Sequence, residues 1–151
     1  MALNVKILEG NPEKGDIIVS PFGDFKISSN SLYTEGIGPC LSIALYDPIR
    51  KIGGLAHISG FHPREALSPE YIIHSMVAEF GVYQKLEAVL AGESLRKDRI
   101  SNIVKRNLAL LTIPVIGEDL GDSGFHQGRA LRLDCPMEEV TVYRLPSKIY
   151  K

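Results

Sequence analysis

The stretch TEGIGPCLSIALYDPIRKIGGLAH, residues 34–57, carries the main fold signal of the chain. Its middle part, CLSIALYD, alternates small or polar residues with apolar ones and predicts a buried strand, and DPIRK has the residues of a turn. The following IGGLAHIS predicts a second strand. Because consecutive strands joined by a short turn usually pair, we expect Cys40 and His57 to lie on neighbouring strands.

Helix signals lie outside this stretch. Ser68 is a suitable N-cap, Pro69 suits the first helical position, and Gly81 is a natural stop after an apolar stripe at helical spacing. A second helix is expected from about Lys97 to Leu111, whereas KLEAVLAG is compatible with a helix or a strand. Strands are predicted for NVKILE, DIIVS, DFKIS, PVIGED, RALRLD and VTVYRL, with a glycine-rich loop over 121–128. This order predicts an α+β domain with a mixed sheet.

Length and composition narrow the function classes. The 151 residues suit a single domain spanning 1–151, and the formal net charge of −1 argues against a dedicated nucleic-acid binder. The first residues lack a secretory signal, and no apolar stretch is long enough to span a membrane. We therefore expect a cytoplasmic protein without direct membrane insertion, in which Cys40 and Cys135 are free thiols.

Cys40 and His57 are candidates for a nucleophile and its base. A free thiol is mostly protonated at neutral pH, so it needs a base or a positive charge nearby, and histidine commonly supplies the base. Gly36 and Gly38 allow a sharp turn and a close approach of substrate to backbone N–H groups that could hold an oxyanion, and the Gly-Gly pair at 53–54 leaves space beside His57. The Thr34 hydroxyl could orient the imidazole.

Each of these residues also has a purely structural interpretation. A cysteine in an apolar strand is often a small buried hydrophobic residue, and a lone histidine is often a satisfied structural residue. Cys40, Cys135, His57 and His62 lack the short pair spacing of zinc motifs, so no metal site is expected. The residues alone make a Cys–His pair possible and leave it open.

A resemblance favours the functional interpretation. The stretch 34–57 resembles the signature of the CheD family, the chemoreceptor glutamine deamidases, with a Thr-x-Gly-x-Gly-Ser-Cys motif, a strand ending in Tyr-Asp, and Gly-Gly-x-x-His. The matching positions are Thr34, Gly36, Gly38, Cys40, Tyr46, Asp47, Gly53, Gly54 and His57. More weakly, IPVIGEDLG followed by Gly128-Arg129 resembles the family's Asp-x-Gly-Gly-x-x-Gly-Arg segment.

The resemblance implies a CheD-like mixed β-sheet sandwich core flanked by helices. It implies a protein-glutamine deamidase with Cys40 as nucleophile, His57 as general base and Thr34 as the residue that positions the histidine. Gly36, Gly38 and Gly54 are then candidates for substrate binding or the oxyanion site. No cofactor is implied. The implied partners are the cytoplasmic helices of chemoreceptors as substrate and a CheC-type phosphatase.

Three departures from the family pattern leave alternatives open. Pro39 replaces the serine before the cysteine, Val89 replaces a lysine, and Glu93 replaces the second glycine after Gly92. The chain is therefore also compatible with a CheD-like binding module of weak catalysis, or with a deamidase acting on another target protein. A peptidase or a transglutaminase-like enzyme using the same Cys–His pair is a further hypothesis.

Overall fold

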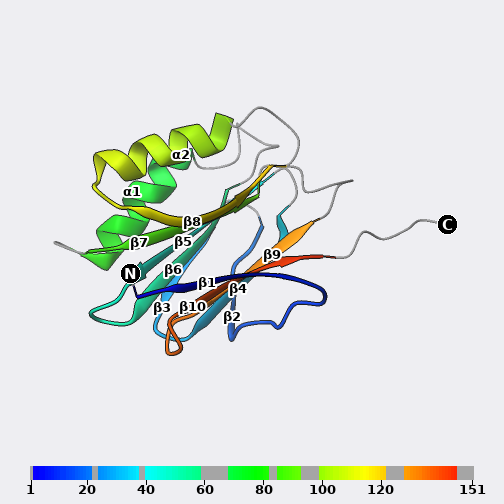
Figure 1. The fold of residues 1–151 in the computed structure, drawn as a ribbon. Helices are drawn as coiled ribbons and strands as arrows, with labels where there is room; N and C mark the ends of the chain where they lie inside the picture. The colour runs from blue at the N-terminus through cyan, green and yellow to red at the C-terminus, as the bar shows by residue number, and fades with distance from the viewer. Residues whose placement is uncertain are drawn as a thin grey trace.

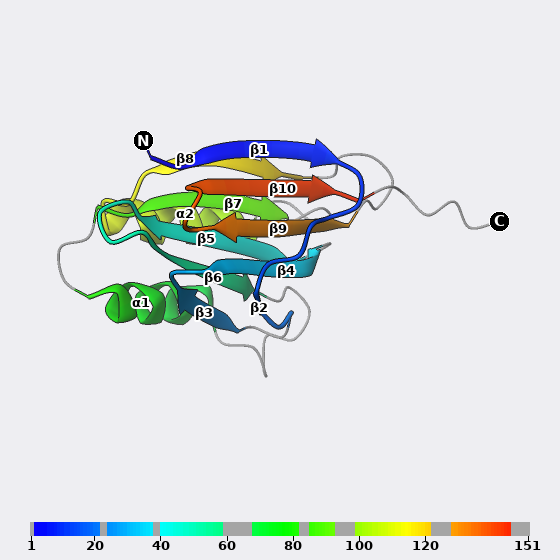
Figure 2. The same ribbon diagram turned by 90° about the horizontal axis from the view of Figure 1, so that it is seen from below.

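The computed structural model describes residues 2–21, 24–37, 40–58, 68–81, 85–92, 99–121 and 128–145. Two five-stranded sheets face each other, and the two helices cover the outer face of one of them (Figures 1 and 2). Each sheet contains parallel and antiparallel neighbours, so the fold is α+β with mixed sheets, as predicted. None of the helices in these ranges is long and apolar enough to cross a membrane.

The sheet under the helices has the order β3-β6-β5-β7-β8. Its strands are β3 (Phe25–Ser28), β5 (Leu41–Asp47), β6 (Ile52–Ile58), β7 (Glu87–Gly92) and β8 (Val115–Leu120). The predicted hairpin is its centre: β5 and β6 are antiparallel, and Ser42 is the register partner of His57. Asp47 closes the connecting turn, because its carboxylate accepts hydrogen bonds from the backbone of Ile49 and Arg50.

The facing sheet has the order β1-β10-β9-β4-β2. Its strands are β1 (Asn4–Glu9), β2 (Ile17–Ile18), β4 (Ser31–Ile37), β9 (Arg129–Asp134) and β10 (Glu139–Arg144). The segment containing Thr34 and Gly36 was expected as a glycine-rich turn, and this prediction was wrong. It forms most of β4, which pairs with β9 on one side and β2 on the other.

Helices α1 (Pro69–Phe80) and α2 (Arg99–Leu110) were both predicted, and α1 begins and ends as expected. Ser68 accepts a hydrogen bond from the Tyr71 N–H at 3.2 Å, and Gly81 follows the last turn with φ of 93°. The apolar face of α1 packs against alternate residues of β5 and β6. The ambiguous segment KLEAVLAG contains β7, a fully buried strand.

Alternation along the central strands divides the interior into two cores. Leu41, Ile43 and Leu45 of β5 face the helices, whereas Ala44 and Tyr46 face the other sheet. By the same alternation, Leu55 and His57 of β6 point between the two sheets. A polar side chain buried there, such as that of His57, needs a hydrogen-bond partner from the facing sheet. The candidate site is built around this hydrogen bond.

Candidate functional site

Thr34 and His57 meet across the two sheets. Leu32 of β4 faces the inter-sheet core, so Thr34, two residues later, faces it as well. Its Oγ1 lies 2.8 Å from Nδ1 of His57, and both side chains are fully buried. The two residues that the sequence paired through the resemblance are therefore in direct contact.

The Val19 carbonyl determines which histidine tautomer this contact favours. Oγ1 of Thr34 donates its single proton to the carbonyl oxygen of Val19 at 3.0 Å. A hydroxyl that has donated its proton can only accept a further hydrogen bond, so Nδ1 of His57 must carry the proton of the 2.8 Å contact. In a neutral ring this leaves Nε2 unprotonated, the form required of a general base.

The free ring nitrogen is buried as well. Nε2 of His57 has no hydrogen-bond partner within the described ranges. In particular, it forms no hydrogen bond with the Cys40 thiol. Burial disfavours the imidazolium ion and lowers the pKa of His57 to about 4. The ring is therefore neutral near pH 7, with a lone pair on Nε2 available to accept a proton.

Cys40 directly precedes β5, beside the end of β6. It stands two positions before Ser42, the register partner of His57, and two residues is the spacing at which strand side chains return to the same face. Cys40 is 7% exposed, and both cysteines of the chain are free. Cys135, in contrast, is fully buried after β9, and burial raises the pKa of its thiol to about 12.

Gly36 lies in a β-bulge beside Thr34. Thr34 pairs with Leu131 and Ile37 with Arg129, so β4 has one residue more than β9 in this interval. Gly36 has φ of 72°, and apart from its two chain neighbours no atom of the described residues lies within 4 Å of the position of a Cβ. Bulges bend a strand and increase its twist, so this one bends β4 near its end at Ile37. Gly38, the other predicted glycine of this segment, lies outside the described residues.

Gly92 was noted in the sequence only as part of an incomplete glycine pair, yet it lies against the candidate nucleophile. It has φ of 127°, and a Cβ there would lie 2.2 Å from the carbonyl oxygen of Cys40 and 2.6 Å from the Ile37 side chain. The end of β7 therefore contacts the backbone of Cys40 so closely that only glycine fits. A glycine at the end of a predicted strand gives no such signal in the sequence.

Gly54 lies on the other face of the sheet. A Cβ at Gly54 would meet Met76 and Phe80 of α1 at 3.0–3.2 Å, so the position packs against the helix. Within β6 it pairs with Leu45 on one side and Ile27 on the other. This location supports a packing role for Gly54 instead of the predicted contact with substrate.

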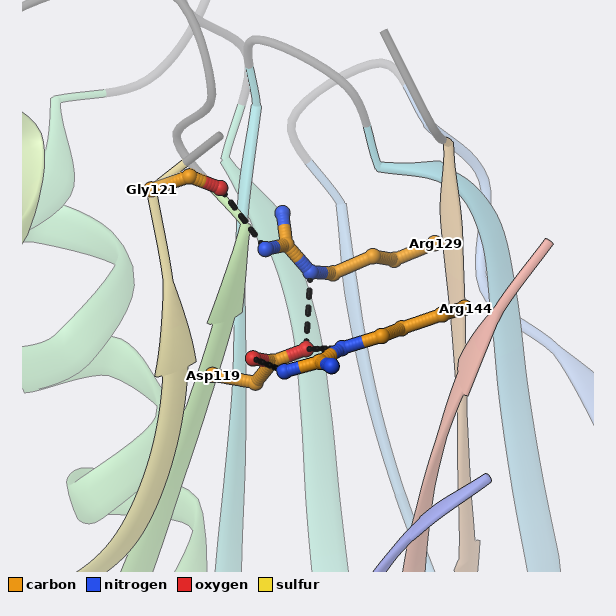
Figure 3. A network of polar contacts seen from close by, with 4 residues as sticks. All are labelled: Asp119, Gly121, Arg129 and Arg144. Carbon is orange, nitrogen blue, oxygen red and sulfur yellow. Dashed lines mark hydrogen bonds and ion pairs between the residues drawn. The ribbon is translucent and has the colours of Figure 1, made fainter. Parts of the chain in front are cut away.

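An ionic network joins the two sheets at the same end of the sandwich (Figure 3). Asp119 of β8 accepts from Nε of Arg129 at 2.9 Å and from Nε and Nη2 of Arg144 at 3.1 and 2.7 Å. Nη2 of Arg129 donates to the Gly121 carbonyl at 2.7 Å, and the Gly121 N–H donates to the Gly92 carbonyl at 3.0 Å. The weakly matching second motif, which contains Asp119, Gly121 and Arg129, therefore reaches the glycine that lies against Cys40.

Throughout the described residues, no three His, Cys, Asp or Glu side chains come close enough to hold a metal ion. Fold and site together define an α+β two-sheet sandwich with a buried threonine–histidine pair between the sheets and a free cysteine directly before β5.

The comparisons with known proteins agree with this class. The probable chemoreceptor glutamine deamidase CheD of Desulforamulus reducens is 29% identical over 96% of this chain and 98% of its own length. The protein named probable chemoreceptor glutamine deamidase CheD 3 of Geobacter sulfurreducens is 30% identical over 88% of this chain and 96% of its own length. The chain belongs to the CheD family.

Two other comparisons add nothing to this assignment. No protein-family model matches the chain. The solved structure of the Bacillus licheniformis hypothetical protein YfiH aligns with a TM-score of 0.36 and 14% identity, over 64% of this chain and 51% of that one. This similarity is too low to support an argument about fold or function.

Proposed function

We propose that this protein is a cysteine-dependent protein-glutamine deamidase in which Cys40 is the nucleophile, His57 the general base and Thr34 the residue that positions the base. The observation that carries the proposal is the Val19–Thr34–His57 chain of hydrogen bonds, which leaves a lone pair on Nε2. A purely structural histidine would use both nitrogens inside the fold, and the second nitrogen here has no partner in the described part of the chain.

The proposed reaction follows acyl-transfer chemistry. Nε2 of His57 accepts the proton of the Cys40 thiol, and the sulfur forms a bond to the carboxamide carbon of a glutamine side chain. His57 then returns the proton to the amide nitrogen, the C–N bond breaks, and ammonia leaves behind a thioester. Water, deprotonated by His57, attacks that thioester, the C–S bond breaks, and glutamate and the free thiol result.

Backbone donors are proposed to stabilise the tetrahedral oxyanion. Pro39 has no N–H, so the N–H of Cys40 is the better donor next to the sulfur. The bulge at Gly36 supports this assignment, because it bends the end of β4 four positions before the cysteine in the sequence. Gly36 and Gly38 are proposed to let substrate approach that backbone.

The substrate is proposed to be the cytoplasmic helices of chemoreceptors, with a CheC-type phosphatase as a regulatory partner and the cytoplasm as the location. Relatives of the chain carry the name chemoreceptor glutamine deamidase, and this supports the substrate class. Residues 1–151 are proposed to act as one domain, because the candidate site takes residues from both sheets.

The test is ammonia release from a purified receptor cytoplasmic fragment. Wild type should release ammonia and increase the mass of the fragment by about one unit per converted glutamine, and Cys40→Ala should do neither. Cys135→Ala is the matched control, since it removes the other thiol, which has no proposed role. Equal background release by wild type and Cys40→Ala would refute the proposal, and backbone cleavage or amine incorporation would indicate a peptidase or a transglutaminase-like enzyme.

A binding module with weak catalysis is the second candidate. It is favoured by the lack of a hydrogen bond between Nε2 of His57 and the Cys40 thiol. The rate of alkylation by iodoacetamide as a function of pH separates the two. Fast alkylation of Cys40 well below pH 8 supports the enzyme, whereas slow alkylation that rises only above about pH 8.5 supports the binding module.

A further inference from the structure

Arg129 of β9 connects its own sheet to the end of a strand in the facing sheet. The residue is fully buried, and its guanidinium group reaches two groups at the end of β8 (Figure 3). Nε donates to the Asp119 carboxylate at 2.9 Å, and Nη2 donates to the Gly121 carbonyl at 2.7 Å. Because the donors of a guanidinium group lie in one rigid plane, the two hydrogen bonds together fix both the distance and the direction of the end of β8.

The end of β8 depends on this contact because β8 is an edge strand. It stands last in the order of its sheet, so among the described residues its backbone pairs with β7 alone. Gly121 follows β8, and its N–H donates to the Gly92 carbonyl at 3.0 Å. Its own carbonyl accepts the hydrogen bond from the facing sheet. Gly121 is therefore held between Gly92 on one side and Arg129 on the other.

Gly92 connects this contact to the backbone of Cys40. It is the register partner of Leu41, the residue after Cys40, and a Cβ at Gly92 would lie 2.2 Å from the Cys40 carbonyl oxygen. The same Cβ would lie 2.6 Å from the Ile37 side chain. Ile37 is in turn the register partner of Arg129. The contacts therefore form a closed ring that begins and ends at Arg129 and includes the backbone of Cys40.

We propose that Arg129 is a positioning residue for the candidate nucleophile, and that through Gly121 and Gly92 it fixes the backbone of Cys40 relative to His57. Thr34, which contacts His57, lies on β4, the neighbour of β9. Both members of the thiol–imidazole pair are then positioned from the same sheet. This placement matters because a misplacement of about 1 Å can lower a rate about a hundredfold. The role rests on the proposed function, since only a reacting thiol requires such placement.

The kinetics of ammonia release from a purified receptor cytoplasmic fragment test this role. Arg129→Lys keeps the buried positive charge but loses the planar fork that binds Asp119 and Gly121 together. We expect kcat to fall about tenfold or more while KM stays within about twofold of wild type. Arg144→Met is the matched control, because it removes a guanidinium group whose side-chain hydrogen bonds in the network go to Asp119 alone. It should keep kcat within a few-fold of wild type.

Backbone NMR separates positioning from a general loss of stability. Amide ¹H and ¹⁵N shifts report local geometry, so those of Gly92 and Cys40 should move in Arg129→Lys and stay at wild-type values in Arg144→Met. If Arg129→Lys does not fold, Arg129→Met takes its place, with the same expected shifts and the same expected fall in kcat. A role limited to stability would lower the urea midpoint of the Arg129 variant and leave kcat and the Cys40 amide unchanged, and this result would overturn the proposal.

The NMR comparison does not require turnover, so the two proposals can fail separately. If wild type released no ammonia, the deamidase activity would be refuted, and the Cys40 amide would still decide whether Arg129 fixes that backbone. If wild type released ammonia and a folded Arg129 variant kept its kcat, the role of Arg129 alone would be refuted.

Discussion

At the residue scale, a single proton on Thr34 determines the chemistry available to His57. The hydroxyl donates to the Val19 carbonyl and accepts from Nδ1, so the ring is held with Nε2 unprotonated. A histidine orienting group is often a carboxylate, which would also stabilise the imidazolium ion. A threonine fixes the tautomer without adding charge, which is consistent with a pKa near 4 and a ring that is neutral at rest.

Substitution of Thr34 tests this assignment. Thr34→Ser keeps the hydroxyl, and we expect its kcat/KM to stay within a few-fold of wild type. Thr34→Val has nearly the same shape but no hydroxyl, and kcat/KM should fall by about two orders of magnitude. Histidine ¹⁵N chemical shifts should report a protonated Nδ1 in wild type. A spectrum with the proton on Nε2 would contradict the argument.

Parts of this residue-level picture were accessible from the sequence. The pairing of the strands that follow Cys40 and contain His57 was predicted from the strand-turn-strand pattern, and the contact of Thr34 with His57 is consistent with the family resemblance. Val19 was not accessible, because its contribution is a backbone carbonyl 15 residues away from Thr34, and a carbonyl leaves no residue-type signal. Arg129 appeared only as part of a weak motif, since its buried position depends on the facing of two sheets.

At the element scale, two glycines with positive φ support the candidate site in different ways. Gly36 needs only its backbone conformation, because its Cβ position is open, whereas Gly92 also needs the absence of a side chain beside Cys40. Gly36→Ala should therefore lower stability by about 1–2 kcal/mol, and Gly36→Asn by less, because asparagine tolerates this conformation.

Gly92→Ala should have a larger effect on activity than Gly36→Ala. The new methyl group would overlap the Cys40 carbonyl, so the backbone of the proposed nucleophile must move. We expect a loss of activity of tenfold or more at temperatures where the protein stays folded, as checked by circular dichroism and ammonia release. Activity equal to that of Gly36→Ala would show that the contact does not position Cys40.

Local sequence signals predicted an element correctly where local interactions determine its ends. Ser68, Pro69 and Gly81 mark α1 correctly because capping is a local interaction. Strand β4 was missed because its glycine looks like turn chemistry, whereas the structure uses it for a bulge within a continuous strand. The ambiguity of KLEAVLAG was resolved by burial on both faces, which the order of the sheet determines and the local sequence does not.

At the scale of the whole molecule, the buried histidine links stability to pH. The pKa of His57 is about 4 in the folded chain and about 6.5 when unfolded, so the unfolded state binds more protons between these values. Stability is therefore fully present above pH 6.5 and is lost as the pH falls toward 4, by about 3 kcal/mol in total. Urea unfolding of wild type and His57→Gln from pH 7.5 to 4 checks this, and the variant should lose much less.

Below pH 4, protonation of buried carboxylates lowers the stability of the fold further. Burial alone would raise the pKa of Asp119, but hydrogen bonds from Arg144 and Arg129 outweigh it and lower the pKa. The same holds for Asp47, where Arg50 provides the main hydrogen bond. Carboxyl groups with lowered pKa stabilise the fold above their unfolded pKa and lose that contribution as they are protonated. The protein should therefore unfold steeply below pH 4, and Asp119→Asn should flatten that part of the profile.

The extra residue of the β4 bulge serves the proposed activity and not the stability of the fold. Thr34 and Ile37 both face the inter-sheet core, and in a regular ladder two residues on one face are separated by a single residue. Deleting Gly36 alone would therefore restore an uninterrupted pairing with β9 while keeping both side chains inside. A chain shortened in this way should fold at least as well and yet be inert, because the thiol would be displaced by about one residue length. The extra residue is thus an insertion that the architecture does not need. Its removal should give a more stable, inactive variant with the same fold.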